Sequence, residues 1–356
     1  MRPKYEASEM MNEMQRNNDY KLIDLIKFFC AYLVIGIHTR PLQAVSVFLD
    51  KIVYYNMSNY AVPFFYACTG YFLMVKQPEK DLHTKLGYRI KKIFNIYIIW
   101  SIVYLPLTVY GWFIEGNKTV EYVLLCIRNY IFVGDNFYSW TLWYLNGLIF
   151  ALILINILSK RISIEKIVGF GSMAYLIGIV LTAFWGHQDK LPALLAFPVN
   201  IYFSIFATTR NGLFQSLVFV SLGMYIADIE KSGKLTKILQ KGKIALFAYL
   251  IKIPISLIGG GQYLSQMLDL PIFFMLFCLI IYTCSKMELH GDFYKKLRNL
   301  SGTIYFVHMY FVALCALVLY KEDYYNFVTF FICAVGATLI AILFNYVRER
   351  KDASSN

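Results

Sequence analysis

Two ionisable side chains interrupt the first long apolar segment of the chain, which runs from Tyr20 to Pro41. Lys27 and His38 lie within it, separated by about three turns of a helix, so they share one face about 16 Å apart along the axis. Asp24 falls on the same face, within reach of an ion pair with Lys27. A charged group at membrane depth costs roughly 2.5–3.5 kcal/mol on insertion scales, so these residues are candidates for function.

This spacing suits an acyl donor that has an anionic end and a thioester end. An acyl-CoA has both, joined by a pantetheine arm of similar length. Lys27 would meet a phosphate on the cytoplasmic side, while the His38 imidazole would take a proton from an attacking hydroxyl near the thioester. A structural alternative stays open, in which Lys27 extends to the inner membrane interface and His38 to the outer one.

Membrane helices are the elements expected to position these side chains. The chain has 356 residues, of which 58% are hydrophobic and 16% are charged, and its mean hydropathy is +0.53. Soluble domains carry about a quarter charged residues. Continuous apolar runs predict an all-α polytopic protein rather than a β-barrel. Ten runs of spanning length are found, at 22–41, 54–75, 93–113, 140–158, 166–185, 211–228, 243–259, 269–285, 302–320 and 326–346.

The basic residues support ten spans. Alternate segments between the runs, beginning with the N-terminal one, hold 25 of the 34 Lys and Arg residues. Lys and Arg gather on the cytoplasmic side of membranes, so both termini are predicted to be cytoplasmic. Topology and anionic lipid account for the formal charge of +12, which gives no case for nucleic-acid binding. The expected organisation is a polar segment at 1–20, one membrane domain at 21–347 and a tail at 348–356.

Several short motifs resemble the acyltransferase-3 family of integral membrane acyltransferases. A basic residue, ten residues and a His follow "ID" in the first span, as in that family. Four further segments resemble it in order and spacing: "VPFFYACTGYFL" (62–73), "YRIKKIFNIYIIW" (88–100), "TLWYLNGLIF" (141–150) and "SGTIYFVHMYF" (301–311). The resemblance implies ten spans in a bacterial plasma membrane and transfer from cytoplasmic acyl-CoA, expected to be acetyl-CoA, to a hydroxyl acceptor at the outer face. Neither a metal nor a permanently bound cofactor is expected.

The resemblance also suggests donor-site residues. Arg89 matches a basic position of the family's entry into the third span, and a guanidinium binds phosphate through two parallel hydrogen bonds. Lys92 lies one helical turn later and is a further candidate. The alternative for this basic stretch is a positively charged anchor at the inner interface.

Three residues are candidates for the acceptor side or for support. Arg210 precedes the sixth span on the outer side, where it would bind the acceptor or stabilise an oxyanion, unless it is an interfacial anchor. Tyr144 is a second such candidate, with an aromatic-belt position as its alternative. His308 is expected in the inner half of the ninth span, as a supporting residue or a hydrogen-bonded core histidine. Lys252, just before Pro254, is a lone cation that could pair with a freed backbone carbonyl.

Some residues depart from the family pattern. Many O-acetylating members carry acids where this chain has Pro63 and Leu148, and Asn95 replaces the family's usual proline. These changes affect the expected acceptor more than the expected donor.

One subgroup shares "IHTRPL", "VPFF" and "TRNGLF" (209–214) with this chain: the membrane half of serine racemases of the vancomycin-resistance type. The pyridoxal-phosphate racemase domain of that subgroup is expected to be absent here. The subgroup's link to serine supply keeps open a transporter for a small polar solute, and a non-catalytic membrane scaffold is the third alternative.

Overall fold

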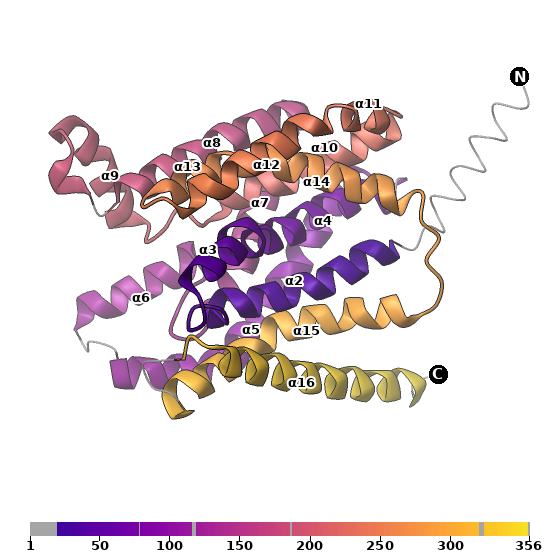
Figure 1. Ribbon diagram of the computed structural model, residues 1–356. Helices are drawn as coiled ribbons and strands as arrows, with labels where there is room; N and C mark the ends of the chain where they lie inside the picture. Colours follow the sequence, from indigo (N-terminus) through magenta and orange to yellow (C-terminus); the bar gives the residue numbers. More distant parts are fainter. Residues whose placement is uncertain (1–19, 78, 116–118, 186, 320–323, 355–356) are drawn as a thin grey trace, which may run out of the picture.

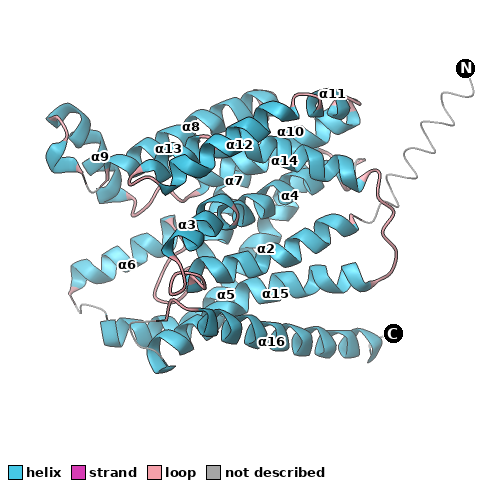
Figure 2. Ribbon diagram, viewed as in Figure 1, coloured by secondary structure: helices cyan, strands magenta, loops and turns pink. Residues whose placement is uncertain are grey.

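The computed structural model describes residues 20–77, 79–115, 119–185, 187–319 and 324–354. Within these ranges every regular element is a helix and none is a strand (Figure 2). The all-α prediction is therefore confirmed for the described part of the chain. Most of the predicted N-terminal segment 1–20, and the last two residues of the predicted tail 348–356, lie outside the described residues.

Helices follow one another with short connections and pack into a bundle (Figure 1). The α-helices are α2 (Lys21–Thr39), α3 (Val47–Asn56), α4 (Ala61–Val75), α5 (Leu82–Glu115), α6 (Val120–Phe132), α7 (Leu142–Leu158), α8 (Ile164–Phe184), α9 (Ala193–Ile205), α10 (Leu217–Lys231), α11 (Leu235–Leu239), α12 (Gly242–Leu257), α13 (Gly261–Met267), α14 (Asp269–Cys284), α15 (Phe293–Leu314) and α16 (Phe327–Ser354). Short 3₁₀ segments are η1 (Ser58–Tyr60) and η2 (Gln188–Lys190), and π segments are η3 (Gly212–Ser216) and η4 (Cys315–Leu319).

All ten predicted spans coincide with helices, but not all of these helices have spanning length. Six helices of the described chain are long and apolar enough to cross a membrane. A seventh span results if α13 and α14, which meet at a bend of 46°, are counted as one. The helices α4, α7, α12 and α14 have only 15, 17, 16 and 16 residues. The helices fit a multi-pass membrane protein, and the count of ten stays a prediction.

The predicted run 54–75 is broken in the structure. It divides into the end of α3, the short segment η1 and the helix α4, which has Pro63 in its first turn. Proline is tolerated there because the first backbone N–H groups of a helix have no partner within it. The side chain of Ser46 caps α3 by accepting a hydrogen bond from the Leu49 amide at 3.3 Å. α3 is therefore a separate short helix at the end of α2.

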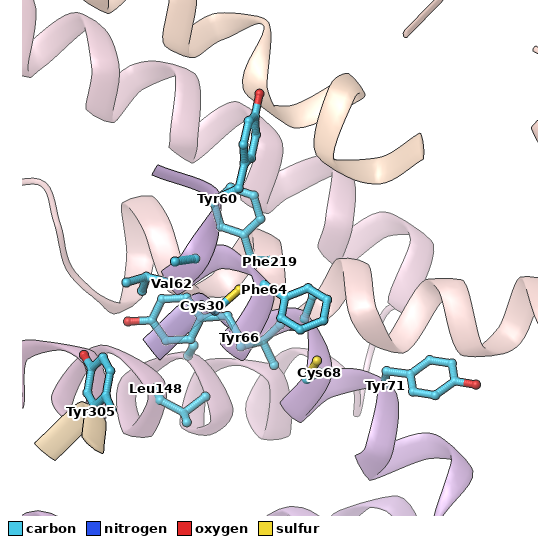
Figure 3. Packing of buried hydrophobic residues seen from close by; sticks show 14 of the residues in the cluster. Cys30, Tyr60, Val62, Phe64, Tyr66, Cys68, Tyr71, Leu148, Phe219 and Tyr305 are labelled. Atoms are coloured by element: carbon cyan, nitrogen blue, oxygen red, sulfur yellow. The ribbon is translucent and has the colours of Figure 1, made fainter. Parts of the chain in front are cut away.

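The tightest contact of the bundle joins α4 to α10. A Cβ atom on Gly70 would lie 1.9 Å from the Val220 carbonyl oxygen, and one on Gly223 would lie 2.0 Å from that of Ala67. Small residues allow two backbones to approach this closely, as is common between membrane helices. Figure 3 shows side chains of α4 within the buried core, together with neighbours from other helices: Val62, Phe64, Tyr66, Cys68, Leu148, Phe219 and Tyr305. This contact fixes α4 in the centre of the molecule.

The helices α2 and α15 run side by side in the same direction. Asp24 pairs with Arg298 near their starts, and His38 meets His308 nearer their ends. α2 begins and α16 ends on the same side of the bundle, at the right in Figure 1. The cytoplasmic location of that side stays a prediction. α16 continues without a break to Ser354, so the described part of the predicted tail extends the last helix.

Candidate active site

Two imidazole rings meet toward the C-terminal ends of α2 and α15. The ring centroids of His38 and His308 lie 5.4 Å apart at an interplanar angle of 40°. The indole ring of Trp140, just before α7, stacks on His38 at 6.3 Å and 20°. Three separate helical regions therefore hold His38 in place, and among the described residues no hydrogen bond is made to its ring.

One nitrogen of His308 is bonded and the other is not. The Nδ1 atom lies 2.7 Å from the Tyr305 carbonyl oxygen, so Nδ1 carries the proton and Nε2 carries the lone pair in the neutral ring. Nε2 is buried and no described residue hydrogen-bonds it. His308 lies past the middle of α15, which begins at Phe293, and its ring contacts His38 near the end of α2. Its predicted place in the inner half of a membrane span stays a prediction.

A cavity of about 300 Å³ opens beside His38. Polar side chains contribute much of its lining, among them Tyr55, Thr182, Thr209, Gln215, Gln262 and Gln266. Arg210 lines the same cavity and lies exposed at its mouth. Arg210 and His38 therefore border one space, and the volume suits a small polar group.

The loop that carries Arg210 is held by its neighbours. The Asn211 side-chain oxygen accepts hydrogen bonds from the Leu213 and Phe214 amides at 3.0 and 3.1 Å, capping η3. The Thr209 hydroxyl lies 2.6 Å from that of Thr182 in α8. An asparagine side chain satisfies the free N–H groups of a helix start in this way, so the sequence fixes the loop locally.

A buried ion pair adjoins the cavity, because Asp269 lines the cavity and Lys252 lies behind it. The Lys252 Nζ lies 2.6 Å from Oδ1 of Asp269 and donates to the Tyr55 carbonyl at 2.7 Å and the Tyr60 hydroxyl at 3.1 Å. The Tyr60 hydroxyl also donates to Asp269 at 2.9 Å. Lys252 is fully buried, and all three of its N–H donors have partners. The predicted pairing of Lys252 with a backbone carbonyl is confirmed, although that carbonyl belongs to α3.

Basic side chains gather at the other end of α2. The Nζ atoms of Lys27 and Lys76 each lie 4.8 Å from the ring centroid of Phe72. Arg298 lies 3.5 Å from the Asp24 carboxylate, which is 6% exposed. Burial lowers the pKa of Lys76, and the nearby cations Arg298 and Lys27 lower it further. The cluster therefore holds more positive charge than Asp24 can neutralise.

Arg89 reaches the same region from α5. It is half-buried and lies close enough to Lys76 for electrostatic interaction. It also interacts with Tyr144, whose ring packs 5.4 Å from that of Tyr305 and 4.8 Å from that of Tyr66. Aromatic side chains thus connect the inner cluster with the helix that carries His308.

A family model described as an acyltransferase domain matches residues 20–346. The chain belongs to the acyltransferase-3 family. Two curated relatives are an amino-acid racemase of Enterococcus faecalis, 32% identical over 61% of this chain and 30% of that protein, and a serine/alanine racemase of Enterococcus gallinarum, 26% identical over 82% and 41%. The chain thus spans less than half the length of these relatives. No solved structure matches.

The two positions at which many acyltransferase-3 members carry acids have different surroundings in this structure. Pro63 lines the cavity, whereas Leu148 is buried in the core. Among the described residues that line the cavity, Asp269 is the one acid, and Lys252 and Tyr60 already bind it. The described lining of the cavity therefore offers amides and hydroxyls, and its carboxylate is already paired.

Other predicted site residues lie apart from the cavity. Tyr144 does not line it, and its contacts are interior ones rather than those of an aromatic belt. Lys92 is exposed on α5, and its role in donor binding stays a prediction. Lys76 and Arg298 were not predicted as site residues, because their positions suit anchors at the inner interface equally well. Asp269 was not predicted either, although an acid at the start of an apolar run is a visible signal for a partner to Lys252.

Proposed function

We propose that this acyltransferase-3 protein moves an acyl group from cytoplasmic acyl-CoA to a hydroxyl acceptor at the outer face of a bacterial plasma membrane. The observation that carries the proposal is the position of His38. It lines a polar cavity, its ring contacts that of His308, and it lies about 16 Å along α2 from Lys27. Acetyl is the acyl group we favour, because a cavity of about 300 Å³ suits a small one.

In the proposed reaction His38 acts as general base. It takes the proton of the acceptor hydroxyl as that oxygen attacks the thioester carbonyl carbon. The carbon–sulfur bond then breaks, and His38 returns the proton to the departing CoA sulfur, so that an ester and free CoA result. Arg210 at the mouth would stabilise the developing oxyanion or hold the acceptor. The free Nε2 of His308 would accept a hydrogen bond from His38 and so orient its ring.

The donor would enter from the inner end. Lys27, Lys76 and Arg89 form a cluster with excess positive charge, which suits the phosphates of CoA. The pantetheine arm would follow α2 past Tyr144 toward His38. Lys92, exposed one turn from Arg89, would add attraction at the entrance.

One observation favours a second candidate, a transporter for a small polar solute such as serine. The bend of 46° between α13 and α14 is that of a broken span or a re-entrant segment, and both helices contribute to the cavity lining. Broken helices often form substrate sites in transporters. The racemase relatives agree with a solute of the amino-acid class.

Inside-out proteoliposomes distinguish these functions. Labelled acetyl-CoA is added outside, and glucose, glycerol and serine are trapped within. An acyltransferase delivers label to a trapped hydroxyl and releases CoA thiol into the bath, and His38→Ala stops both. If labelled serine instead crosses without any acyl donor, and His38→Ala blocks that movement, the transporter is correct and the acyltransferase proposal fails. Equal CoA release by the wild type and His38→Ala overturns the role of His38.

A further inference from the structure

A second cavity lies on the opposite side of α2 from His38. It has a volume of about 390 Å³ and lies between α2, α3 and α16. On α2 it is lined by Phe29, Leu33 and Gly36. At 100° per residue these positions point roughly opposite to the face that carries Lys27 and His38. We call this space the α2 groove.

The α2 groove is apolar along its length and polar at one end. Side chains of Val53, Met57 and Phe330 complete its apolar walls, while Asp50 lies at its outer rim. From Phe29 to Gly36 it follows α2 for about 10 Å. A narrow apolar channel parallel to a membrane helix fits a hydrocarbon chain better than a polar group, because burying methylene groups is favourable.

Tyr54 joins the groove to the active-site cavity. Its side chain lines both spaces. The Arg40 guanidinium lies 4.0 Å from the centre of the Tyr54 ring, and its Nε donates to Asp50 at 2.8 Å. Tyr54 thus forms a shared boundary of the two cavities, and the Arg40–Asp50 pair makes this boundary polar.

We infer that the acceptor is an amphiphile of the outer leaflet, whose hydrocarbon tail lies in the α2 groove while its hydroxyl-bearing head passes Tyr54 to reach His38. This inference rests on the proposed acyltransferase function and names its acceptor class. The acyl chain of the donor is a poorer occupant. A donor that enters along the Lys27 face would have to carry its chain around α2 to reach the groove.

Gly36 allows the groove to be filled without disturbing the helix. A Cβ atom at Gly36 would have no heavy atom within 4 Å, so Gly36→Leu projects a side chain into open groove space, and leucine is a better helix former than glycine. Gly36→Ala is the size control, because it leaves most of the groove open. Gly302→Leu on α15 is the position control, since Gly302 is equally uncrowded but lies outside the groove.

The measurement compares acceptors that share a head but differ in the tail, in nanodisc-reconstituted protein. The pairs are hexadecyl glucoside with glucose, and 1-O-hexadecylglycerol with glycerol. We expect the wild type to prefer the tailed acceptor by at least about tenfold in kcat/KM, and Gly36→Leu to lose that preference while transfer to the free head persists. Gly36→Ala and Gly302→Leu should keep the preference.

Binding of labelled hexadecyl glucoside, measured without donor, separates this inference from the proposed function. In one outcome the wild type binds hexadecyl glucoside, and loses about tenfold of that affinity on Gly36→Leu, while transferring no acyl group. That result supports the groove and refutes the acyltransferase proposal. Equal use of tailed and free acceptors by the wild type overturns the inference. So does a folded Gly36→Leu variant that binds hexadecyl glucoside as the wild type does, or that loses both acceptors equally.

Discussion

Asp269 and His38 both line the cavity, and the polar groups around these two residues differ in how completely their hydrogen-bonding capacity is used. Lys252 and Asp269 form an ion pair in which all three lysine donors have partners. Around His38, the neighbouring His308 leaves Nε2 without a partner among the described residues, and the His38 ring packs without hydrogen bonds. A saturated network stabilises a fold, whereas a buried group with free capacity is available to a substrate.

This difference predicts opposite consequences for mutation. Removing a member of the saturated network leaves a buried charge without its partner, which costs stability. Removing a group with free capacity costs little stability, because no hydrogen bond is lost with it, but it removes chemistry from the site. Substitution of Lys252 or Asp269 should therefore lower stability, whereas substitution of His38 should lower activity.

The largest effect is expected at His38. Removal of a positioned general base typically lowers a rate by 10²–10⁴-fold, so His38→Ala should reduce acyl transfer to that extent. The melting temperature of the purified protein should stay near that of the wild type, since Trp140 and His308 contact the ring only by packing. Transfer at the wild-type rate by this variant would show that His38 has no role in the reaction and that its contacts are structural.

The second effect is expected at Lys252, where substitution should change stability rather than activity directly. Lys252→Met should lower the free energy of unfolding by about 3–5 kcal/mol, because Asp269 would stay buried without its cation. Lys252→Met combined with Asp269→Asn should recover most of that loss, since the amide oxygen can still accept from Tyr60. Lys243→Met, an exposed position on the same helix, is the control.

Denaturation in a single detergent measures the free energy of unfolding of the wild type and of these three variants. A fully stable Lys252→Met variant that has lost transfer or solute movement would contradict this assignment. Lys252 would then belong with the functional groups of the cavity, despite its saturated contacts.

The sequence could single out His38 as a candidate because the relevant pattern is local. The spacing of Lys27 and His38 within one helix fixes their common face, whatever the rest of the chain does. Hydropathy likewise located ten helical segments. The pairing of His38 with His308, and of Lys252 with Asp269, depends instead on which helices pack together, and one sequence does not contain that information. The break before α4 was also hidden inside a continuous apolar run, and the short helix α13 precedes the run that predicted α14.

The smallest effect is expected at the end of α2 that carries Lys27. There Arg298 is paired with Asp24, whereas Lys27 lies over the Phe72 ring and Arg89 is half-buried beside Tyr144. Lys27 and Arg89 therefore resemble His38 and His308, because their charge is available to a ligand. Charge-assisted hydrogen bonds contribute about 1.5–3 kcal/mol each, so Lys27→Ala or Arg89→Ala should raise KM for acyl-CoA by about 10- to 150-fold and change kcat less.

Lys91→Ala on the exposed face of α5 is the matched control, and it should leave KM for acyl-CoA unchanged. Titration calorimetry with CoA checks the same prediction without turnover. Loss of affinity in Lys27→Ala and Arg89→Ala, with an unchanged melting temperature, would assign the inner cluster to the donor. Unchanged CoA affinity in both variants would mean that these cations serve only as interfacial anchors, and the donor would have to reach His38 by another route.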